Sequence, residues 1–198
     1  MQTTRLIIVA VGGQGNLLAS KVLGEAALLA DVPVRMSEIH GMAQRGGVVE
    51  SAILFGEGRS TLISDGEADV LVGFEPAETL RALKKCTPRT VVITNLSPLT
   101  PFTVTIGRGV YPSLAEIQKQ IRRKTARLTA LDAVALAREA GNVLAVNMVL
   151  LGALIQSGTL PLSAAQVQTA IATRTRPEFV GVNTKAFELG FAAADEAP

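Results

Sequence analysis

The sequence begins with an uninterrupted apolar run, Leu6-Ile7-Ile8-Val9-Ala10-Val11, which leads directly into Gly12-Gly13-Gln14-Gly15. Such a run is typical of a strand that is buried on both faces of a parallel sheet. Apolar residues return in segment 17–23, and this segment predicts a helix after the glycines. The stretch therefore predicts a strand, a tight turn and a helix, which together form the opening unit of an α/β fold.

The rest of the chain continues this alternation of strands and helices. We expect strands at residues 5–11, 34–36, 48–55, 61–63, 69–73, 90–94, 102–106 and 126–128, and helices at 16–30, 76–85, 114–122, 130–139, 142–156, 163–172 and 184–193. Segment 142–156 is apolar almost all round, which predicts a helix in the core or against another subunit. The fold class is thus α/β, a three-layer, mostly parallel, Rossmann-like sheet with helices on both faces, in a single domain of residues 1–198.

The turn after the first strand is a candidate binding site. Its glycines permit positive φ angles and close approach of a ligand to the backbone, while the amides at the start of the next helix favour a phosphate or carboxylate. The candidate residues are Gly12, Gly13, Gln14 and Gly15, although a tight turn without a ligand explains the glycines equally well. A dinucleotide fingerprint is not met, because Leu18 occupies its third glycine position. Glu38 at the expected acidic distance keeps a nicotinamide or flavin site as a minor alternative.

Segment 37–47 is a second glycine-rich stretch, and we expect it to be a long polar loop. It carries a carboxylate, an imidazole, an amide and a guanidinium among its glycines, so its side chains can converge on a ligand. The candidate residues here are Glu38, His40, Gly41, Gln44, Arg45 and Gly46. Arg45 is the natural partner for a carboxylate or phosphate, since its guanidinium offers paired donors in one plane. The alternative is a solvated turn in which His40 only caps a helix or fills a gap.

The composition limits the functional classes to which this chain can belong. Hydrophobic residues make up 48% and charged residues 18%, which fits a well-buried α/β core with some apolar surface left for a partner. A formal net charge of +2 and 4% aromatic residues give no support for nucleic-acid binding. The longest apolar segment, 143–155, is shorter than the ~20 residues of a membrane span, so we expect no membrane-spanning helix and no membrane as a partner. With no recognisable export leader, a cytoplasmic protein is expected.

The cysteine and histidine counts exclude several kinds of site. The single cysteine, Cys86, allows no internal disulfide and no cysteine-ligated zinc or iron–sulfur site built by this chain alone. The single histidine, His40, excludes a metal site made of several histidines. No G-x-S-x-G motif is present, which argues against a Ser/His/Asp hydrolase.

The chain resembles the gamma subunit of 2-oxoacid:ferredoxin oxidoreductases, and within that family most closely the beta subunit of the indolepyruvate type. The resemblance spans nearly the whole chain, and the histidine-to-glycine loop is its most specific motif. The matching segments are Gly12-Gly13-Gln14-Gly15, Ser37-Glu38-Ile39-His40-Gly41-Met42-Ala43-Gln44-Arg45-Gly46-Gly47, Ala68-Asp69-Val70-Leu71, Phe74-Glu75-Pro76, Asn147-Met148-Val149-Leu150-Leu151-Gly152-Ala153 and Lys185-Ala186-Phe187-Glu188-Leu189-Gly190. The chain departs from the family at Ala10, where a further glycine is usual.

This resemblance implies a multi-subunit enzyme that decarboxylates a 2-oxoacid on thiamine diphosphate, passes two electrons through iron–sulfur clusters to ferredoxin, and releases an acyl-coenzyme A. The chain has no Gly-Asp-Gly thiamine motif and one cysteine, so partner subunits are expected to carry both cofactors. This subunit would then shape the active site and contribute the two glycine-rich loops to coenzyme A or substrate binding. Alone, it is expected to be inactive. The apolar segment 142–156 and the high apolar fraction further predict that the isolated chain forms a homodimer.

Two other readings stay open. A stand-alone nucleotide- or coenzyme A-binding module predicts the same anion site without a partner, and an NAD(P)-dependent dehydrogenase predicts that the chain alone binds the dinucleotide. A basic stretch formed by Lys119, Arg122, Arg123, Lys124 and Arg127 could attract ferredoxin or the coenzyme A phosphates. We interpret it instead as a solvated helix face.

Overall fold

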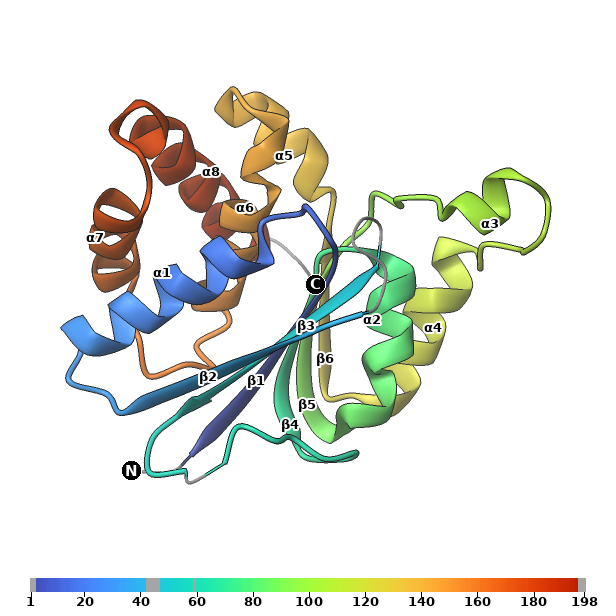
Figure 1. The fold of residues 1–198 in the computed structure, drawn as a ribbon, viewed down its shortest axis with the longest axis horizontal. Helices are drawn as coiled ribbons and strands as arrows, with labels where there is room; N and C mark the ends of the chain where they lie inside the picture. Colours follow the sequence, from blue (N-terminus) through green and yellow to red (C-terminus); the bar gives the residue numbers. More distant parts are fainter. Residues whose placement is uncertain (1–2, 42–46, 59, 196–198) are drawn as a thin grey trace.

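A computed structural model describes residues 3–41, 47–58 and 60–195 as a twisted sheet with helices on both faces (Figure 1). The six strands lie in the order β2-β3-β1-β4-β5-β6. Their bounds are β1 Thr4–Val11, β2 Val34–His40, β3 Val48–Phe55, β4 Ala68–Gly73, β5 Cys86–Asn95 and β6 Arg127–Leu131. The pairs β1–β4, β4–β5 and β5–β6 are parallel, whereas β3 runs antiparallel to both β1 and β2. The predicted α/β class with a mostly parallel sheet is confirmed.

The helices divide into two layers, each covering one hydrophobic core (Figure 1). The larger layer holds α1 Asn16–Leu29, α5 Ala133–Ala140, the 3₁₀ turn η2 Val143–Ala145, α6 Val146–Gln156, α7 Ala164–Arg174 and α8 Pro177–Asp195. The smaller layer holds α2 Pro76–Ala82, the 3₁₀ turn η1 Leu83–Lys85 and α4 Leu114–Lys124. Both cores draw on alternate residues of β1: Leu6, Ile8 and Ala10 face the larger layer, and Ile7 and Val9 face the smaller one. This explains why β1 is apolar without interruption.

Three predictions about local structure are wrong. Residues 61–63 form no strand, because their contacts are not those of a ladder: the N–H of Leu62 donates to Oγ of Ser60, and Ile63 is buried in the smaller core and accepts a hydrogen bond from Lys85. Residues 102–106 were expected to be a strand but contain the short helix α3, Phe102–Thr105, in a lobe that projects from the sheet (Figure 1). A strand needs a neighbour for its backbone hydrogen bonds, and this lobe offers none. Residues 37–40 belong to β2 instead of a loop, since β2 pairs with β3 along its whole length.

The apolar helix α6 is buried by its own chain. Residues Val146 to Ile155 of α6 are all buried, and α8 packs closely along it. Two glycines permit this approach: a Cβ on Gly152 would lie 2.0 Å from the carbonyl oxygen of Phe187, and one on Gly190 would lie 1.9 Å from that of Val149. Of the two alternatives read from the sequence, the structure therefore supports burial in the core of this subunit.

Within the described ranges, no helix is long and apolar enough to cross a membrane.

Candidate functional site

The two glycine-rich segments meet at the carboxyl edge of the sheet. The strands β1 and β2 both run antiparallel to β3, so their carboxyl ends lie on the same edge. Gly12 directly follows β1, and its N–H donates to the carbonyl oxygen of Gly47 over 2.8 Å. Ligands of open α/β sheets collect outside the carboxyl ends of strands, so this is the edge where a binding site is expected.

The glycine turn adopts backbone angles that suit glycine. The φ angles of Gly13 and Gly15 are +98° and +82°, in the left-handed region. Around Gly13 there is open space, whereas a Cβ on Gly15 would lie 2.5 Å from Nδ2 of Asn147, which donates to the Gly15 carbonyl oxygen. No side chain caps the start of α1. Its first amides thus remain available to an anion, and the helix dipole favours negative charge there.

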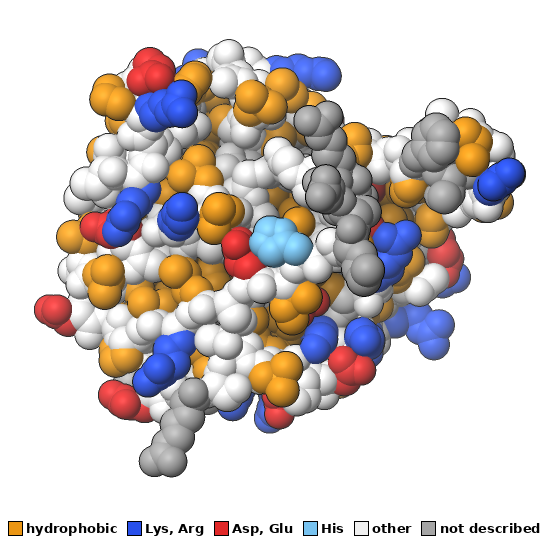
Figure 2. Space-filling view, in the orientation of Figure 1, with side chains coloured by type: hydrophobic (Ala, Val, Ile, Leu, Met, Phe, Trp, Pro, Cys, Tyr) orange, Lys and Arg blue, Asp and Glu red, His pale blue; other side chains and the backbone are white. Residues whose placement is uncertain are grey.

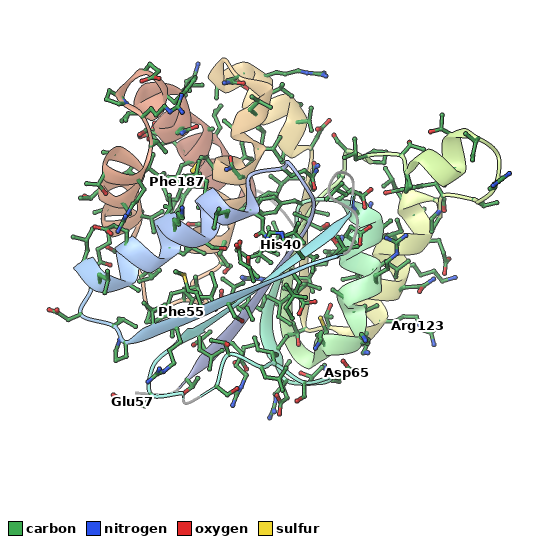
Figure 3. All side chains as sticks on the ribbon, viewed as in Figure 1. His40, Phe55, Glu57, Asp65, Arg123 and Phe187 are labelled. Atoms are coloured by element: carbon green, nitrogen blue, oxygen red, sulfur yellow. The ribbon has the colours of Figure 1, made fainter. Side chains whose placement is uncertain are left out.

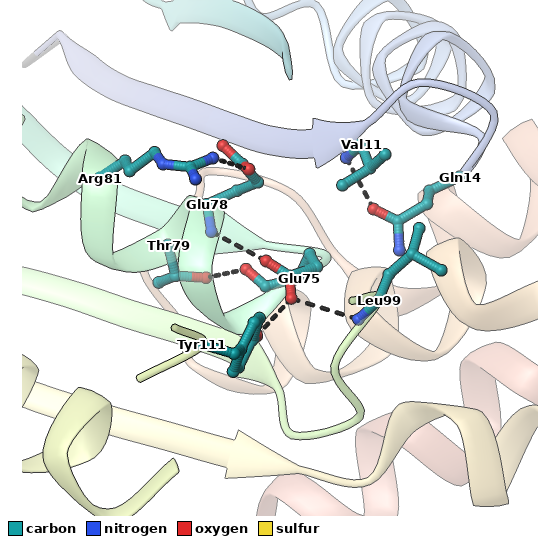
Figure 4. Close-up of polar contacts among 8 residues, drawn as sticks. All are labelled: Val11, Gln14, Glu75, Glu78, Thr79, Arg81, Leu99 and Tyr111. Carbon is teal, nitrogen blue, oxygen red and sulfur yellow. Dashed lines mark hydrogen bonds and ion pairs between the residues drawn. The ribbon is translucent and has the colours of Figure 1, made fainter. Parts of the chain in front are cut away.

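Gln14 has a structural role in this turn. Its Oε1 accepts a hydrogen bond from the N–H of Val11 over 2.8 Å, and its Nε2 donates to the carbonyl oxygen of Phe74 over 3.3 Å. The close-up in Figure 4 shows the first of these bonds. Gln14 thereby joins the ends of β1 and β4, so a ligand would compete with these bonds for its side chain. The backbone amides are better placed for binding than this amide group.

Glu38 and His40 lie on the face of β2 that carries α1. The register places Glu38 beside Ser51 and His40 beside Val49, on the same face as the core residues Ile53 and Phe55 of β3. Oγ of Ser51 donates to Oε1 of Glu38 over 3.0 Å, and Nε2 of His40 lies 3.6 Å from Oε2 of Glu38. The Glu38 side chain is 21% exposed and that of His40 63%.

His40 is the only histidine of the chain and is therefore the pale-blue side chain of Figure 2, at the surface beside an acidic group; Figure 3 labels its position on the ribbon. The Glu38 carboxylate is thus held by a hydrogen bond from Ser51, while the imidazole of His40 reaches solvent. The described residues contain no group of three His, Cys, Asp or Glu side chains that could hold a metal ion.

Two polar residues on α1 escaped the sequence analysis. Asn16 and Ser20 are 5% and 3% exposed, and their side chains have no hydrogen-bond partner among the described residues. They share one face of α1 with Gly24, which approaches the Met36 side chain of β2. Because α1 runs back along the sheet, this face carries Asn16 and Ser20 toward the end of β2 that holds Glu38 and His40.

Buried polar atoms are almost always paired with protein or water, so the free amide of Asn16 and hydroxyl of Ser20 mark a place where water or a ligand completes the site. The signal in the sequence is a pair of polar residues four apart on one face of α1.

The structure describes only one of the four remaining candidate residues of segment 37–47. Gly41 extends the β2–β3 pairing, since its N–H donates to the Val48 carbonyl oxygen over 2.8 Å. Gln44, Arg45 and Gly46 lie outside the described residues. Their assignment to the site stays a prediction, supported by the position of the two ends of their segment at Gly41 and Gly47.

A buried carboxylate, Glu75, organises the neighbouring strand end (Figure 4). Glu75 is 1% exposed and accepts hydrogen bonds from the N–H groups of Glu78 and Leu99 and from the hydroxyl of Tyr111. Burial raises the pKa of the Tyr111 hydroxyl, and its hydrogen bond to Glu75 raises this pKa further. Burial also raises the pKa of Glu78, which pairs with Arg81. The Phe74-Glu75-Pro76 motif thus fixes the base of the α3 lobe.

Cys86 is no candidate nucleophile. It is 2% exposed within the smaller core, and burial raises the pKa of its thiol to about 11. A thiol that is protonated and enclosed at neutral pH is unreactive.

Comparison with known proteins identifies the family. A family model described as pyruvate ferredoxin/flavodoxin oxidoreductase matches residues 5–193. The chain belongs to this family. Indolepyruvate oxidoreductase subunit IorB of Pyrococcus horikoshii is 43% identical over 198 residues, 99% of this chain and 98% of that protein. The IorB subunit of Thermococcus kodakarensis is 41% identical with the same coverage. The resemblance read from the glycine-rich loops is thus confirmed.

Two solved structures share the fold of this chain. The gamma subunit of a keto/oxoacid ferredoxin oxidoreductase from Geobacter sulfurreducens superposes with a TM-score of 0.71 at 23% identity, over 98% of this chain and 99% of that one. A 2-oxoglutarate:ferredoxin oxidoreductase from Magnetococcus marinus gives a TM-score of 0.74 at 18% identity, over 100% of this chain and 32% of that chain. The same fold therefore occurs both as a separate gamma subunit and as about a third of a longer chain.

Proposed function

We propose that this chain is the cofactor-free subunit of a cytoplasmic, indolepyruvate-type 2-oxoacid:ferredoxin oxidoreductase, which converts a 2-oxoacid to an acyl-coenzyme A. Its relatives at about 40% identity are named as subunits of indolepyruvate oxidoreductases, which supports both the reaction class and the need for a partner. The partner subunit carries thiamine diphosphate and iron–sulfur clusters and delivers electrons to ferredoxin.

The observation that carries the site assignment is the hydrogen bond between Gly12 and Gly47, which joins the two glycine-rich loops at the carboxyl edge of the sheet. The first amides of α1 offer donors to a carboxylate or phosphate there. Arg45 adds a charged, bidentate donor from the other loop. In this proposal the subunit forms one wall of the crevice that holds coenzyme A or the 2-oxoacid.

We assign both cofactors to the partner on the basis of what this chain lacks. One cysteine cannot supply the four ligands that a cysteine-bound iron–sulfur cluster takes, and the sequence lacks a Gly-Asp-Gly thiamine motif. When bound in the partner, thiamine diphosphate supplies the carbon nucleophile for decarboxylation and the clusters accept the electrons. The residues of this chain bind and orient the anionic substrate, and the loops exclude water from the crevice.

The first experiment tests assembly. A tagged chain purified from its native source should bring with it a thiamine- and cluster-containing subunit, and the complex should reduce ferredoxin with a 2-oxoacid and coenzyme A. Recovery of the chain alone, together with tight binding of coenzyme A or a dinucleotide, would instead favour the stand-alone module or the dehydrogenase.

The second experiment tests the site in the assembled enzyme. Arg45→Ala removes a charge-assisted contact of about 1.5–3 kcal/mol, which should raise the Michaelis constant for coenzyme A or the 2-oxoacid by about 10- to 150-fold. Arg123→Ala on α4 is the matched control, because it removes the same charge away from the two loops (Figure 3). An unchanged Michaelis constant and turnover in an intact Arg45→Ala complex would contradict the assignment.

A further inference from the structure

We infer that a cavity between α1, η2, α6 and the α7–α8 connection binds a small carboxylate with an apolar body. The cavity has a volume of about 340 Å³, which lies in the range of small-molecule sites. It is lined by residues of all these elements, among them Leu18, Asn147, Arg176, Phe179 and Asn183. The cavity adjoins the first glycine-rich loop, because Asn147 donates to the Gly15 carbonyl oxygen, but none of the lining residues belongs to either loop. The inference therefore does not rest on the proposed function.

Positive charge and helix dipoles converge on this cavity. Ala145 and Asn147 place the start of α6 on its wall. The 3₁₀ turn η2 leads directly into this helix and is capped by Asn142, and Oδ1 of Asn147 accepts the N–H of Met148. Thr175 and Arg176, which directly precede the nineteen-residue helix α8, also line it. The starts of α6 and α8 thus both lie at this cavity, where the helix dipoles add partial positive charge.

Two arginines line the same cavity, and only one of them is neutralised. Arg174 pairs with Glu25, whereas Arg176 has no carboxylate partner among the described residues. The nearest acidic residue in the sequence is Glu178 in the first turn of α8, and it forms no ion pair with Arg176 in the described part of the chain. The balance leaves one guanidinium free, which suits a monoanion such as a carboxylate in a bidentate contact.

Asn183 adds a polar side chain to the cavity wall. This residue lies on α8, is 8% exposed, and makes no side-chain hydrogen bond within the described part of the chain. Its amide atoms are not among the enclosed, unpaired atoms of the described residues, so they face the cavity. Nδ2 of Asn183 can therefore donate to a carboxylate that enters the cavity.

The rest of the lining is apolar. Phe179 and Leu144 line the cavity and are 41% and 75% exposed to solvent as whole residues. Leu18 and Ala145 complete the apolar surface. An inorganic anion would leave these apolar side chains exposed to water, whereas an aromatic or branched aliphatic acid would cover them. The combination of one free guanidinium and an apolar wall therefore favours an organic acid over phosphate.

Titration of the purified full-length chain with phenylacetate, followed by calorimetry and by amide shifts in NMR spectra, tests this inference. Phenylacetate should bind and should shift amides of α6 and α8 around the cavity. Uncharged 2-phenylethanol and the small anions acetate and phosphate should bind at least 10-fold more weakly. Equal affinity for phenylacetate and phenylethanol, or stronger binding of phosphate, would contradict the inference.

Two variants and one control localise the binding. Arg176→Gln and Asn183→Leu should each weaken phenylacetate binding about 10-fold or more. Asn183→Leu should leave the melting temperature nearly unchanged, because the Asn183 side chain makes no hydrogen bond within the described part of the chain. Arg123→Gln, on the opposite helix layer, should bind as the unmodified chain does. Equal affinity of Arg176→Gln and Arg123→Gln would overturn the assignment, as would the absence of any binding.

Discussion

At the scale of single residues, Gly13 and Gly15 occupy similar backbone conformations for different reasons. Both have positive φ angles, which cost a residue with a Cβ about 1–2 kcal/mol. Only Gly15 also lies against another side chain, since its missing Cβ leaves room for the amide of Asn147. The turn therefore depends on Gly15 for packing as well as for conformation, and this links the start of α1 to the start of α6.

Alanine substitutions separate these two effects. Gly13→Ala should lower the free energy of unfolding by about 1–2 kcal/mol, the cost of the left-handed conformation. Gly15→Ala should cost clearly more, because its Cβ would meet Nδ2 of Asn147 and disturb the bond to the Gly15 carbonyl oxygen. Urea unfolding measures both values. Adding Asn147→Ala to Gly15→Ala should recover part of the difference, and equal losses for the two single variants would refute this account.

At the scale of elements, the sequence predicted the buried parts of the sheet well and the exposed parts poorly. The bounds of β1, β3 and β4 follow from apolar runs that both cores require. Strand β2 was expected to end at Met36, because its polar residues and the glycines after them indicated a loop. It continues to His40 because it is the last strand of the sheet, where polar side chains remain compatible with pairing.

The same reasoning applies to the candidate site. The glycine spacing predicted the turn, and the family resemblance predicted that both loops contribute to one binding function. The strand order of the structure then places both at one edge. The structural use of the Gln14 side chain and the unpaired atoms of Asn16 and Ser20 depend on contacts distant in sequence. The sequence shows a polar pair four residues apart, but no periodicity specifies that its atoms are buried and unpaired.

The anchor of the α3 lobe gives a prediction at this scale. Tyr111→Phe removes the hydroxyl that donates to the buried carboxylate of Glu75, a bond to a charged acceptor worth about 1.5–3 kcal/mol. The free energy of unfolding should fall by this amount, because the lone pair of Glu75 is left without its partner.

A double-mutant cycle provides the control. With Glu75→Gln as background, Tyr111→Phe should cost less than in the unmodified chain, since the acceptor is no longer charged. The free energies come from urea unfolding monitored by circular dichroism. Independent, additive losses would show that this hydrogen bond contributes nothing to the lobe.

At the scale of the whole molecule, the high apolar fraction has an internal explanation. The helices α6 and α8 pack against each other within the larger core. The apolar surface of α6 is therefore buried by its own chain and is not itself a subunit interface. What remains exposed includes Met36 and Ile39 on the edge strand β2, at 44% and 59%. An edge strand with apolar side chains favours pairing with another strand, and a two-fold axis allows β2 to pair with its own copy.

We therefore expect the isolated chain to be a dimer in sedimentation velocity at micromolar concentration. Ile39→Lys should shift it to the monomer, because a charge on the outer strand opposes strand pairing and repels its own copy across the axis. Leu62→Lys is the matched control: Leu62 is 73% exposed and lies outside every strand, so this change should leave the dimer intact. A monomer in the unmodified chain would refute self-association, and equal dissociation of both variants would refute the part assigned to β2.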